Sequence, residues 1–126
     1  MTENEISKII VDSAIEVHRT LGGAGLLEGV YKESLFWELK SRNLLVEKEL
    51  EVPIIYKGNS LASPLRLDLL VEKKVVVEAK AVVNYHPIFE TQALTYLRLL
   101  HLKLALVINF GDKRVSNGIH RVVKGL

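Results

Sequence analysis

Three charged side chains interrupt two apolar stretches in the middle of the chain. Asp68 lies in the first stretch, residues 65–71, and Glu78 and Lys80 lie in the second, residues 75–83. Both stretches are rich in Val or Leu, which favours strands. Because side chains alternate along a strand, Glu78 and Lys80 share one face of it. The pattern therefore predicts neighbouring strands that carry two acids and one lysine.

The turn between these strands sets which residues face each other. A three-residue turn at 72–74 pairs Val71 with Val75. That register places Asp68 directly across from Glu78. Two carboxylates at a Cβ separation of roughly 5 Å repel each other, and in a partly buried site one becomes protonated unless a cation lies between them. Magnesium removes this conflict, since it takes one or two carboxylates, keeps several waters and binds phosphate.

Lys80 lies beside the two acids, where its ammonium group has two chemical uses. It would orient an attacking water, or neutralise charge that develops on the phosphorus. The alternative interpretation is a surface ladder of ion pairs, in which Lys80 pairs with Asp68 or Glu78 and no metal is involved. Spacing alone does not decide between a metal site and such a ladder.

Two helices are predicted to precede these strands. A capping box formed by Thr2 and Glu5 begins a helix that should end near Leu21, because apolar residues recur at helical spacing up to that point. Glycines break it, and a second helical pattern covers residues 27–43. We therefore expect the chain to enter the sheet only after residue 43.

The first predicted strand, residues 46–54, has one face in water. Its apolar residues and its glutamates alternate, which is typical of a strand covered on one side. One face is expected to carry Val46, Leu50, Val52 and Ile54, and the other Glu47, Glu49 and Glu51. A turn is predicted at residues 57–60.

After the paired acids the chain returns to a helix and then to strands. Pro87 suits the first turn of a helix, because the amide hydrogen that it lacks would be unpaired there. The run 104–110 predicts a strand buried on both faces, and residues 119–123 a short further strand. The order of helix, three strands, helix and strand predicts an α/β fold, with a mixed sheet of four to five strands flanked by helices.

Composition narrows the class of protein. With 126 residues, 48% hydrophobic and 25% charged, the chain has the size and balance of one globular domain, residues 1–126. It has no cysteine, which excludes disulfide scaffolds, thiolate zinc sites and cysteine nucleophiles. The longest apolar run, Leu104–Ile108, is far shorter than the roughly 20 residues of a membrane span, and the start is acidic where a secretory signal is basic. We expect a cytoplasmic protein with no membrane partner.

The charge is unevenly distributed along the chain. The formal net charge is only +2, yet from residue 98 onward basic residues greatly outnumber acids, with Asp112 the one acid. Such asymmetry favours a polyanionic partner. The basic residues of this quarter are Arg98, Lys103, Lys113, Arg114, Arg121 and Lys124. Together with Lys73 and Lys74 they are candidate phosphate contacts that would position nucleic acid without reading its sequence.

Several motifs resemble one known group of proteins. Asp68 followed by residues 78–80, Glu-Ala-Lys, resembles the catalytic signature of the PD-(D/E)XK nuclease superfamily, whose core has the order αβββαβ. Residues 92–96, Gln-Ala-Leu-Thr-Tyr, match the QxxxY motif of its RecB-like members. Residues 25–31, Gly-Leu-Leu-Glu-Gly-Val-Tyr, match the pattern that names the GxxExxY protein family, a branch of that superfamily. The resemblance covers nearly the whole chain and implies a restriction-endonuclease-like fold.

The resemblance implies a role for each matched residue. Asp68, Glu78 and Glu28 are the implied ligands of Mg²⁺, for which Mn²⁺ would substitute. Lys80 is the implied catalytic lysine. Gln92 and Tyr96, four residues apart and so on one helix face, are implied to line the site. The implied catalytic set is therefore Asp68, Glu78, Lys80, Glu28, Gln92 and Tyr96.

Simpler interpretations stay open for several residues. Glu28 would also be a favourable acid in the first turn of its helix, where the helix dipole suits it. Tyr31 falls on the apolar stripe of its helix and is expected to pack. Gln92 would serve equally as a solvated helix residue, and Tyr96 as part of the core. The four histidines show no paired metal spacing and are expected to be structural.

These features predict a magnesium-dependent nuclease that hydrolyses phosphodiester bonds in nucleic acid, with DNA favoured over RNA. No separate recognition module fits in the chain, so specificity is expected to be low or to come from a homodimer or a protein partner. One alternative is a non-catalytic module that binds nucleic acid or protein and retains the nuclease fold. A second is a hydrolase of small phosphoesters, which would need a closed pocket.

Overall fold

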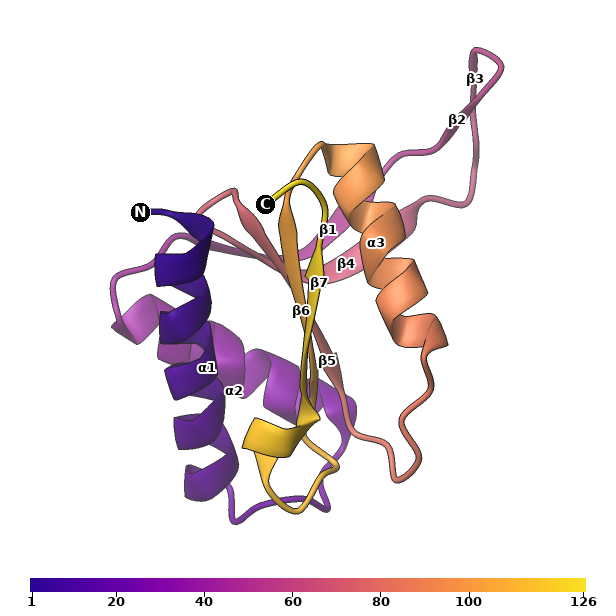
Figure 1. The fold of residues 1–126 in the computed structure, drawn as a ribbon. Coiled ribbons are helices and arrows are strands. Elements are labelled where there is room, and N and C mark those ends of the chain that lie inside the picture. The colour runs from indigo at the N-terminus through magenta and orange to yellow at the C-terminus, as the bar shows by residue number, and fades with distance from the viewer.

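A five-stranded β-sheet with helices on both faces makes up the computed structural model, which describes residues 1–126 (Figure 1). The strands lie in the order β1-β4-β5-β6-β7, and β5 and β6 are parallel while the other neighbours are antiparallel. This confirms the predicted α/β class, the mixed sheet and the order of the elements. In chain order the elements are α1 (Glu3–Thr20), α2 (Glu28–Ser41), β1 (Val46–Val52), β2 (Ile55–Tyr56), β3 (Asn59–Ser60), β4 (Leu65–Val71), β5 (Val75–Lys80), α3 (Ile88–Leu100), β6 (Leu104–Asn109), the 3₁₀ turn η1 (Val115–Gly118) and β7 (Ile119–Val123).

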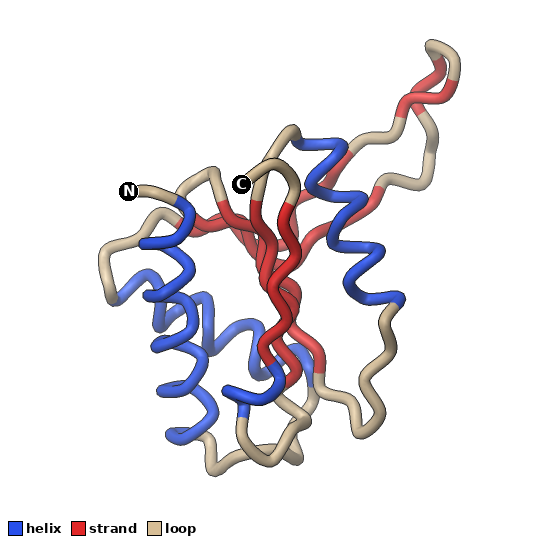
Figure 2. Tube along the Cα trace, in the orientation of Figure 1, coloured by secondary structure: helices blue, strands red, loops and turns tan.

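The sheet separates two hydrophobic cores. Helices α1 and α2 pack on one face and α3 on the other, so that the strands lie between two helical layers (Figure 2). Twenty buried residues form the larger core beneath α1 and α2. Nine form the smaller core beneath α3. Strand β6, an interior strand of the sheet, is buried along its whole length, as its unbroken apolar run predicts.

Helix α1 begins as its sequence predicts. The side chain of Thr2 accepts a hydrogen bond from the Glu5 amide, and the Glu5 carboxylate accepts one from the Thr2 amide. These reciprocal bonds satisfy two amide groups that would otherwise have no partner within the helix. No helix combines the length and the apolar character that crossing a membrane requires.

The predicted alternation of β1 is wrong beyond its first half. Val46 packs in the larger core, whereas Val52 packs in the smaller core on the other face. The reversal occurs at Glu49, whose φ of 54° is in the left-handed region. The facing strand β4 changes sides at the same level, because Leu67 belongs to the smaller core and Leu69 to the larger. Asp68 therefore lies where both strands change the face that they bury.

Strand β5 is shorter than predicted, ending at Lys80 and not at residue 83. The buried side chain of Asn109 accepts a hydrogen bond from the Val82 amide and donates one to the Val82 carbonyl. These bonds satisfy the backbone that a longer strand would have paired. Gly111 completes this contact, since a Cβ atom there would lie 2.4 Å from the Val82 carbonyl oxygen.

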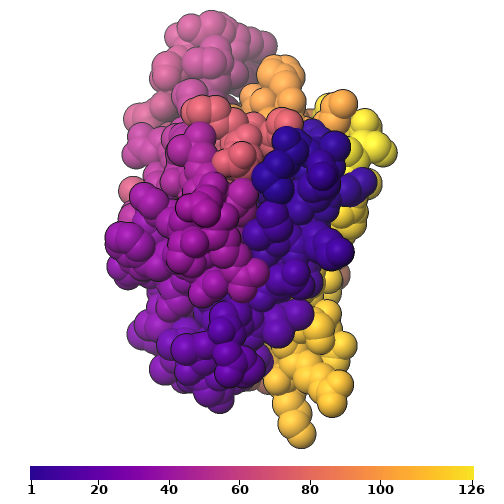
Figure 3. Space-filling model, turned by 90° about the vertical axis from the view of Figure 1, so that its left-hand side faces the viewer, coloured from indigo at the N-terminus to yellow at the C-terminus, as the bar shows by residue number.

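A short hairpin, β2 and β3, extends beyond the sheet from the ends of β1 and β4. Its turn lies within the predicted turn region, residues 57–60, and Lys57 and Gly58 both have positive φ. In the view onto α1 and α2, the hairpin projects at the top of the molecule (Figure 3). Ile55 and Tyr56 on this hairpin are exposed.

Candidate active site

The β4–β5 hairpin places the two acids opposite each other. The strands pair Val71 with Val75 and continue in the same register to Leu69 and Val77. Glu72 and Lys73 in the turn both have positive φ, as a tight hairpin requires. The predicted three-residue turn is confirmed, and with it the register that sets Asp68 across from Glu78.

The backbone pairing between β4 and β5 stops at Leu69 and Val77. Beyond this point, the carboxylates of Asp68 and Glu78 form the hydrogen bonds between the two strands. Oε2 of Glu78 accepts a hydrogen bond from the amide of Asp68 at 2.7 Å. Oδ2 of Asp68 accepts one from the amide of Ala79 at 2.8 Å. Each acid therefore uses one oxygen to hold the backbone of the opposite strand. The other oxygen of each carboxylate makes no hydrogen bond within the protein.

Burial of the pair makes its negative charge costly. Glu78 is 7% exposed, and burial together with the charge of Asp68 raises its pKa to about 8. Burial also raises the pKa of Asp68, against the hydrogen bond from Ala79. Both acids prefer a proton or a cation to an unpaired charge. This is the conflict that the sequence predicted, and a divalent cation would relieve it.

Lys80 completes the group from the end of β5. Ala79 faces the larger core. Because side chains alternate along β5, Glu78 and Lys80, on either side of Ala79, both point to the other face of the sheet. The Nζ of Lys80 lies 3.9 Å from Oε1 of Glu28 and 4.7 Å from the centre of the Phe89 ring on α3. The lysine thus bridges an acid on α2 and an aromatic ring on α3, and does not pair with Asp68 or Glu78. The simple ladder of ion pairs along the sheet is not formed.

Glu28 reaches the site from the first turn of α2. Burial raises its pKa, and the positive charge of Lys80 opposes that rise. Both interpretations of Glu28 therefore describe its position, because it lies at a helix N-terminus and also beside Lys80. No three His, Cys, Asp or Glu side chains in the structure are gathered as a complete set of metal ligands.

The glycine-rich loop before Glu28 is held by Tyr31. Its hydroxyl donates to the Gly23 carbonyl at 2.7 Å and accepts from the Leu26 amide at 3.1 Å. Its ring is fully buried and stacks on Phe110, with the ring centres 4.8 Å apart. Tyr31 packs as predicted, and its hydroxyl also fixes the loop that leads to Glu28. Sequence reasoning missed this second contribution.

His18 and Asn109 support the same end of the sheet. The ring nitrogen Nε2 of His18 lies 3.1 Å from the Phe110 carbonyl oxygen. Asn109, directly beside Lys80 in the β5–β6 register, holds the segment that follows Lys80 through its contacts with Val82. The segment 108–111 contributes to the family resemblance, but the sequence assigned no role to Asn109.

Gln92 and Tyr96 lie on one face of α3, as their spacing predicts. With Leu65 and Thr95 they line a groove of about 300 Å³. Gln92 is exposed, whereas Tyr96 is buried and donates its hydroxyl hydrogen to the Arg66 carbonyl at 2.8 Å. Burial raises the pKa of Tyr96 to about 12. Tyr96 therefore braces β4 two residues before Asp68.

The basic residues expected to contact phosphate are scattered. Lys73 and Lys74 lie at the β4–β5 turn, roughly 13 Å along the strand from Glu78 at ~3.3 Å per residue, and Lys73 is paired with Glu47. Arg121 is bonded to Asn4 and Ser7 of α1. Because the turn and the site are at opposite ends of β5, Lys73 and Lys74 remain candidate contacts only for a phosphate distant from the acids.

A different lysine lies near the acids. Lys32, one helical turn after Glu28, forms an ion pair with Glu49 and acts to lower the pKa of Asp68. It was missed because it belongs to none of the motifs. Tertiary packing of α2 against β1 brings it to this position.

The carboxylate pair suits a hard divalent cation. The donors are oxygens from two acids, each of which retains one oxygen without a partner in the protein, and both acids are destabilised as anions by burial. Magnesium binds through one or two carboxylates and keeps several waters. Asp68 and Glu78 fit that requirement without a third protein ligand.

Comparison with known proteins gives one match. The family model described as the PD-(D/E)XK nuclease superfamily matches residues 4–122. No curated protein matches the chain, and no solved structure matches it. The matched range includes both strands of the acid pair, α2 with Glu28 and α3 with Gln92 and Tyr96.

Proposed function

The chain belongs to the PD-(D/E)XK nuclease superfamily, and from that membership and the geometry of its site we propose that it is a metal-dependent nuclease that hydrolyses phosphodiester bonds. Membership implies a nucleic-acid substrate and a restriction-endonuclease-like fold, and DNA is the proposed substrate. The observation that carries the proposal is the buried pair formed by Asp68 and Glu78, with Lys80 on the same face of the sheet.

The metal is proposed to be Mg²⁺, with Mn²⁺ as a substitute. Nucleases of this superfamily generally use divalent metals. Asp68 and Glu78 would hold the ion, and Glu28 would join them directly or through a water. When bound, the ion supplies polarisation of the phosphodiester and lowers the pKa of a nearby water.

Lys80 is the proposed catalytic lysine. Contacts with Glu28 and Phe89 hold its ammonium group close to the acids, and its side chain is 21% exposed, so solvent and substrate both reach it. From this position it would orient the attacking water and donate hydrogen bonds to the phosphate oxygens as negative charge develops on them. Glu28 would hold the ammonium group of Lys80 in this position.

The residues around the acids are proposed to have supporting roles. Gly25, Glu28 and Tyr31 fit the GxxExxY branch of the superfamily, in which we place the chain. Tyr96 would fix β4 at Asp68, and exposed Gln92 would contact substrate from the groove on α3. Sequence specificity would come from a homodimer or from a protein partner.

Cleavage assays test the proposal directly. Supercoiled plasmid, single-stranded DNA and single-stranded RNA are each incubated with the protein in Mg²⁺, in Mn²⁺ and in chelator. We expect cleavage that requires metal and falls by at least about 100-fold in Lys80→Ala and in Glu78→Gln, the scale of loss when one electrostatic catalytic group is removed. Metal binding by the same proteins is measured by calorimetry.

Lys8→Ala is the matched control for contamination and for loss of surface charge. Lys8 is exposed on α1 and makes no ion pair, so this variant, purified in the same way, should retain wild-type activity. Equal cleavage by wild type, Lys80→Ala and Glu78→Gln would assign the activity to a contaminant. No cleavage by wild type together with no metal binding would refute the nuclease proposal and favour a binding module that retains the fold.

A further inference from the structure

Strand β1 is distorted at Glu49, which lies across from the site acid Asp68. The backbone φ of Glu49 is 54°, a conformation that residues with a side chain seldom adopt. The β1–β4 ladder is paired on both sides of this position but not at the position itself. Strain of this kind persists where the surrounding structure imposes it, and it is concentrated at functional sites.

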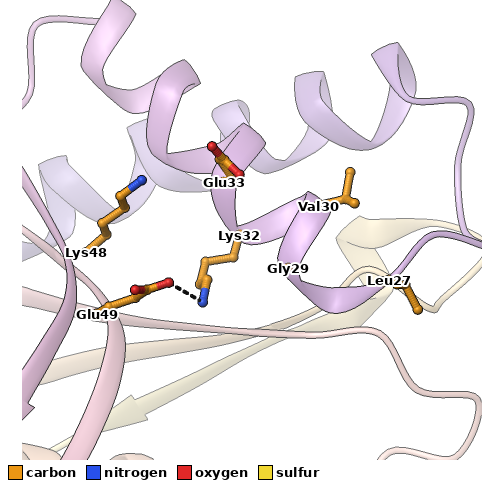
Figure 4. Close-up of a pocket in the computed structure, with 7 residues that line it drawn as sticks. All are labelled: Leu27, Gly29, Val30, Lys32, Glu33, Lys48 and Glu49. Atoms are coloured by element: carbon orange, nitrogen blue, oxygen red, sulfur yellow. Dashed lines mark hydrogen bonds and ion pairs between the residues drawn. The ribbon is translucent and has the colours of Figure 1, made fainter.

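The carboxylate of Glu49 is paired with a lysine from α2. Its Oε1 lies 3.0 Å from Nζ of Lys32, and Figure 4 shows the two side chains pointing toward each other between α2 and β1. Its other oxygen lies 4.0 Å from the guanidinium group of Arg66 on β4. The ion pair borders a pocket of about 370 Å³ that is lined by Leu27, Gly29, Val30, Lys32, Glu33, Lys48 and Glu49.

Lys32 also lies within the electrostatic reach of the catalytic acids. It follows Glu28 by one helical turn and so shares its face of α2. Its positive charge acts to lower the pKa of both Asp68 and Glu28, and for Asp68 its effect exceeds that of Lys80. Lys32 is therefore a second cation beside the site, on the opposite side of Asp68 from β5.

We propose that Lys32 is a substrate-binding residue that exchanges the carboxylate of Glu49 for a phosphate of the nucleic-acid strand. In the free protein Glu49 neutralises Lys32 and holds it at the pocket. When the strand binds at Asp68 and Glu78, the ammonium group turns to a neighbouring phosphate of that strand. This inference rests on the proposed nuclease function and extends its site to β1.

The exchange is physically reasonable because both partners are partly solvated. The Lys32 side chain is 22% exposed and that of Glu49 is 45% exposed, and ion pairs of this kind contribute little to stability. Lysine binds phosphate as a point charge on a flexible stem, so it needs no fixed fork geometry. Arg66 is 61% exposed and stays beside Glu49 when Lys32 leaves.

Binding measurements on four proteins test the exchange. Wild type, Lys32→Ala, Glu49→Gln and the double variant are titrated against fluorescent single-stranded and double-stranded DNA in chelator, and Lys8→Ala is the control for lost surface charge. We expect Lys32→Ala to weaken binding roughly tenfold, the lower end for a hydrogen bond to a charged group. Glu49→Gln should tighten binding several-fold, because Lys32 is then already free.

The double variant separates exchange from simple repulsion. If Glu49 acts by holding Lys32, Glu49→Gln gives no tightening once Lys32 is Ala. Tightening that persists in the double variant, or equal affinity of wild type and Lys32→Ala, overturns the proposal. Metal-dependent cleavage by wild type is measured in parallel. If wild type cleaves DNA while the exchange fails, only the exchange proposal is refuted. If wild type neither binds nor cleaves DNA, the nuclease proposal itself is refuted.

Discussion

Asp68 and Glu78 each accept a hydrogen bond from the backbone of the opposite strand, at the point where the β4–β5 ladder stops. The two acids therefore have a structural function as well as the proposed chemical one. Their bonds keep the ends of β4 and β5 together while their remaining oxygens stay available. Because this requires two buried carboxylates to approach each other, stability should depend on pH and on metal.

Glu78→Gln should stabilise the metal-free protein at alkaline pH. The pKa of Glu78 is raised from 4.5 to about 8 in the folded protein. Below pH 4.5 the carboxyl is protonated in both states, but as pH rises the unfolded chain loses its proton first, so stability falls until pH passes about 8. Gln removes this loss and still accepts the hydrogen bond from the Asp68 amide. At pH 9 in chelator, the free energy of unfolding of the variant should exceed that of wild type by on the order of a few kcal/mol, as measured by thermal unfolding.

Two controls accompany that measurement. Glu51→Gln changes an exposed acid on β1 and should shift the unfolding temperature equally at every pH. Saturating Mg²⁺ at pH 8 should raise the stability of wild type more than that of Glu78→Gln, because a ligand stabilises only the state that binds it. A wild-type stability that does not change between pH 5 and pH 8 would contradict the assigned burial of the pair.

The register of the acid pair could be predicted from sequence because it depends on local rules. Residues 72–74 form a tight turn, and strands β4 and β5 have strong β-propensity, so the turn alone sets Asp68 against Glu78. The same holds for the capping box of α1. Elements whose geometry follows from neighbouring residues were predicted correctly.

Features imposed by tertiary contacts could not be predicted in this way. Glu49 has a backbone conformation that its residue type disfavours, and the alternation of β1 fails there. The side chain of Asn109 bonds to the backbone of Val82 and so ends β5 early. The hydrophobic periodicity of the sequence does not indicate that a side chain takes over these backbone hydrogen bonds. Lys32 reaches the site through the packing of α2, which single-sequence patterns do not specify.

Glu28→Gln should lower activity by acting through Lys80. The carboxylate lies 3.9 Å from the lysine, and its loss leaves Lys80 without its acidic partner. We expect kcat to fall roughly tenfold, because the ammonium group of Lys80 is then no longer held in its position beside the acids. The Glu28→Gln/Lys80→Ala double variant should be no less active than Lys80→Ala alone, since residues that act as a unit are not additive. Additive losses would show that Glu28 acts independently of Lys80, as a direct metal ligand.

Tyr31→Phe should loosen the loop that leads to Glu28. The variant keeps the stacking on Phe110 but removes the hydroxyl that bonds to Gly23 and Leu26. Loss of these partly buried hydrogen bonds should cost about 1–2 kcal/mol of stability. Hydrogen exchange at the Leu26 amide should become faster, and activity should fall. Tyr56→Phe, at an exposed tyrosine of the β2–β3 hairpin, should change none of these quantities.

Tyr96 and Gln92 belong to one QxxxY motif, yet substitutions at the two positions should have different effects. Changes at Tyr96 should affect stability and Mg²⁺ affinity, and changes at Gln92 should affect KM. Tyr96→Phe removes the hydrogen bond to the Arg66 carbonyl, so it should cost about 1 kcal/mol of stability and weaken Mg²⁺ binding through the displaced Asp68. Gln92 is exposed, so Gln92→Ala should leave the unfolding temperature and Mg²⁺ affinity unchanged while raising KM. Unfolding curves, metal titrations and steady-state kinetics of both variants separate these effects. A Tyr96→Phe protein with normal Mg²⁺ affinity would show that the hydrogen bond from Tyr96 to β4 does not position Asp68, and would limit Tyr96 to packing.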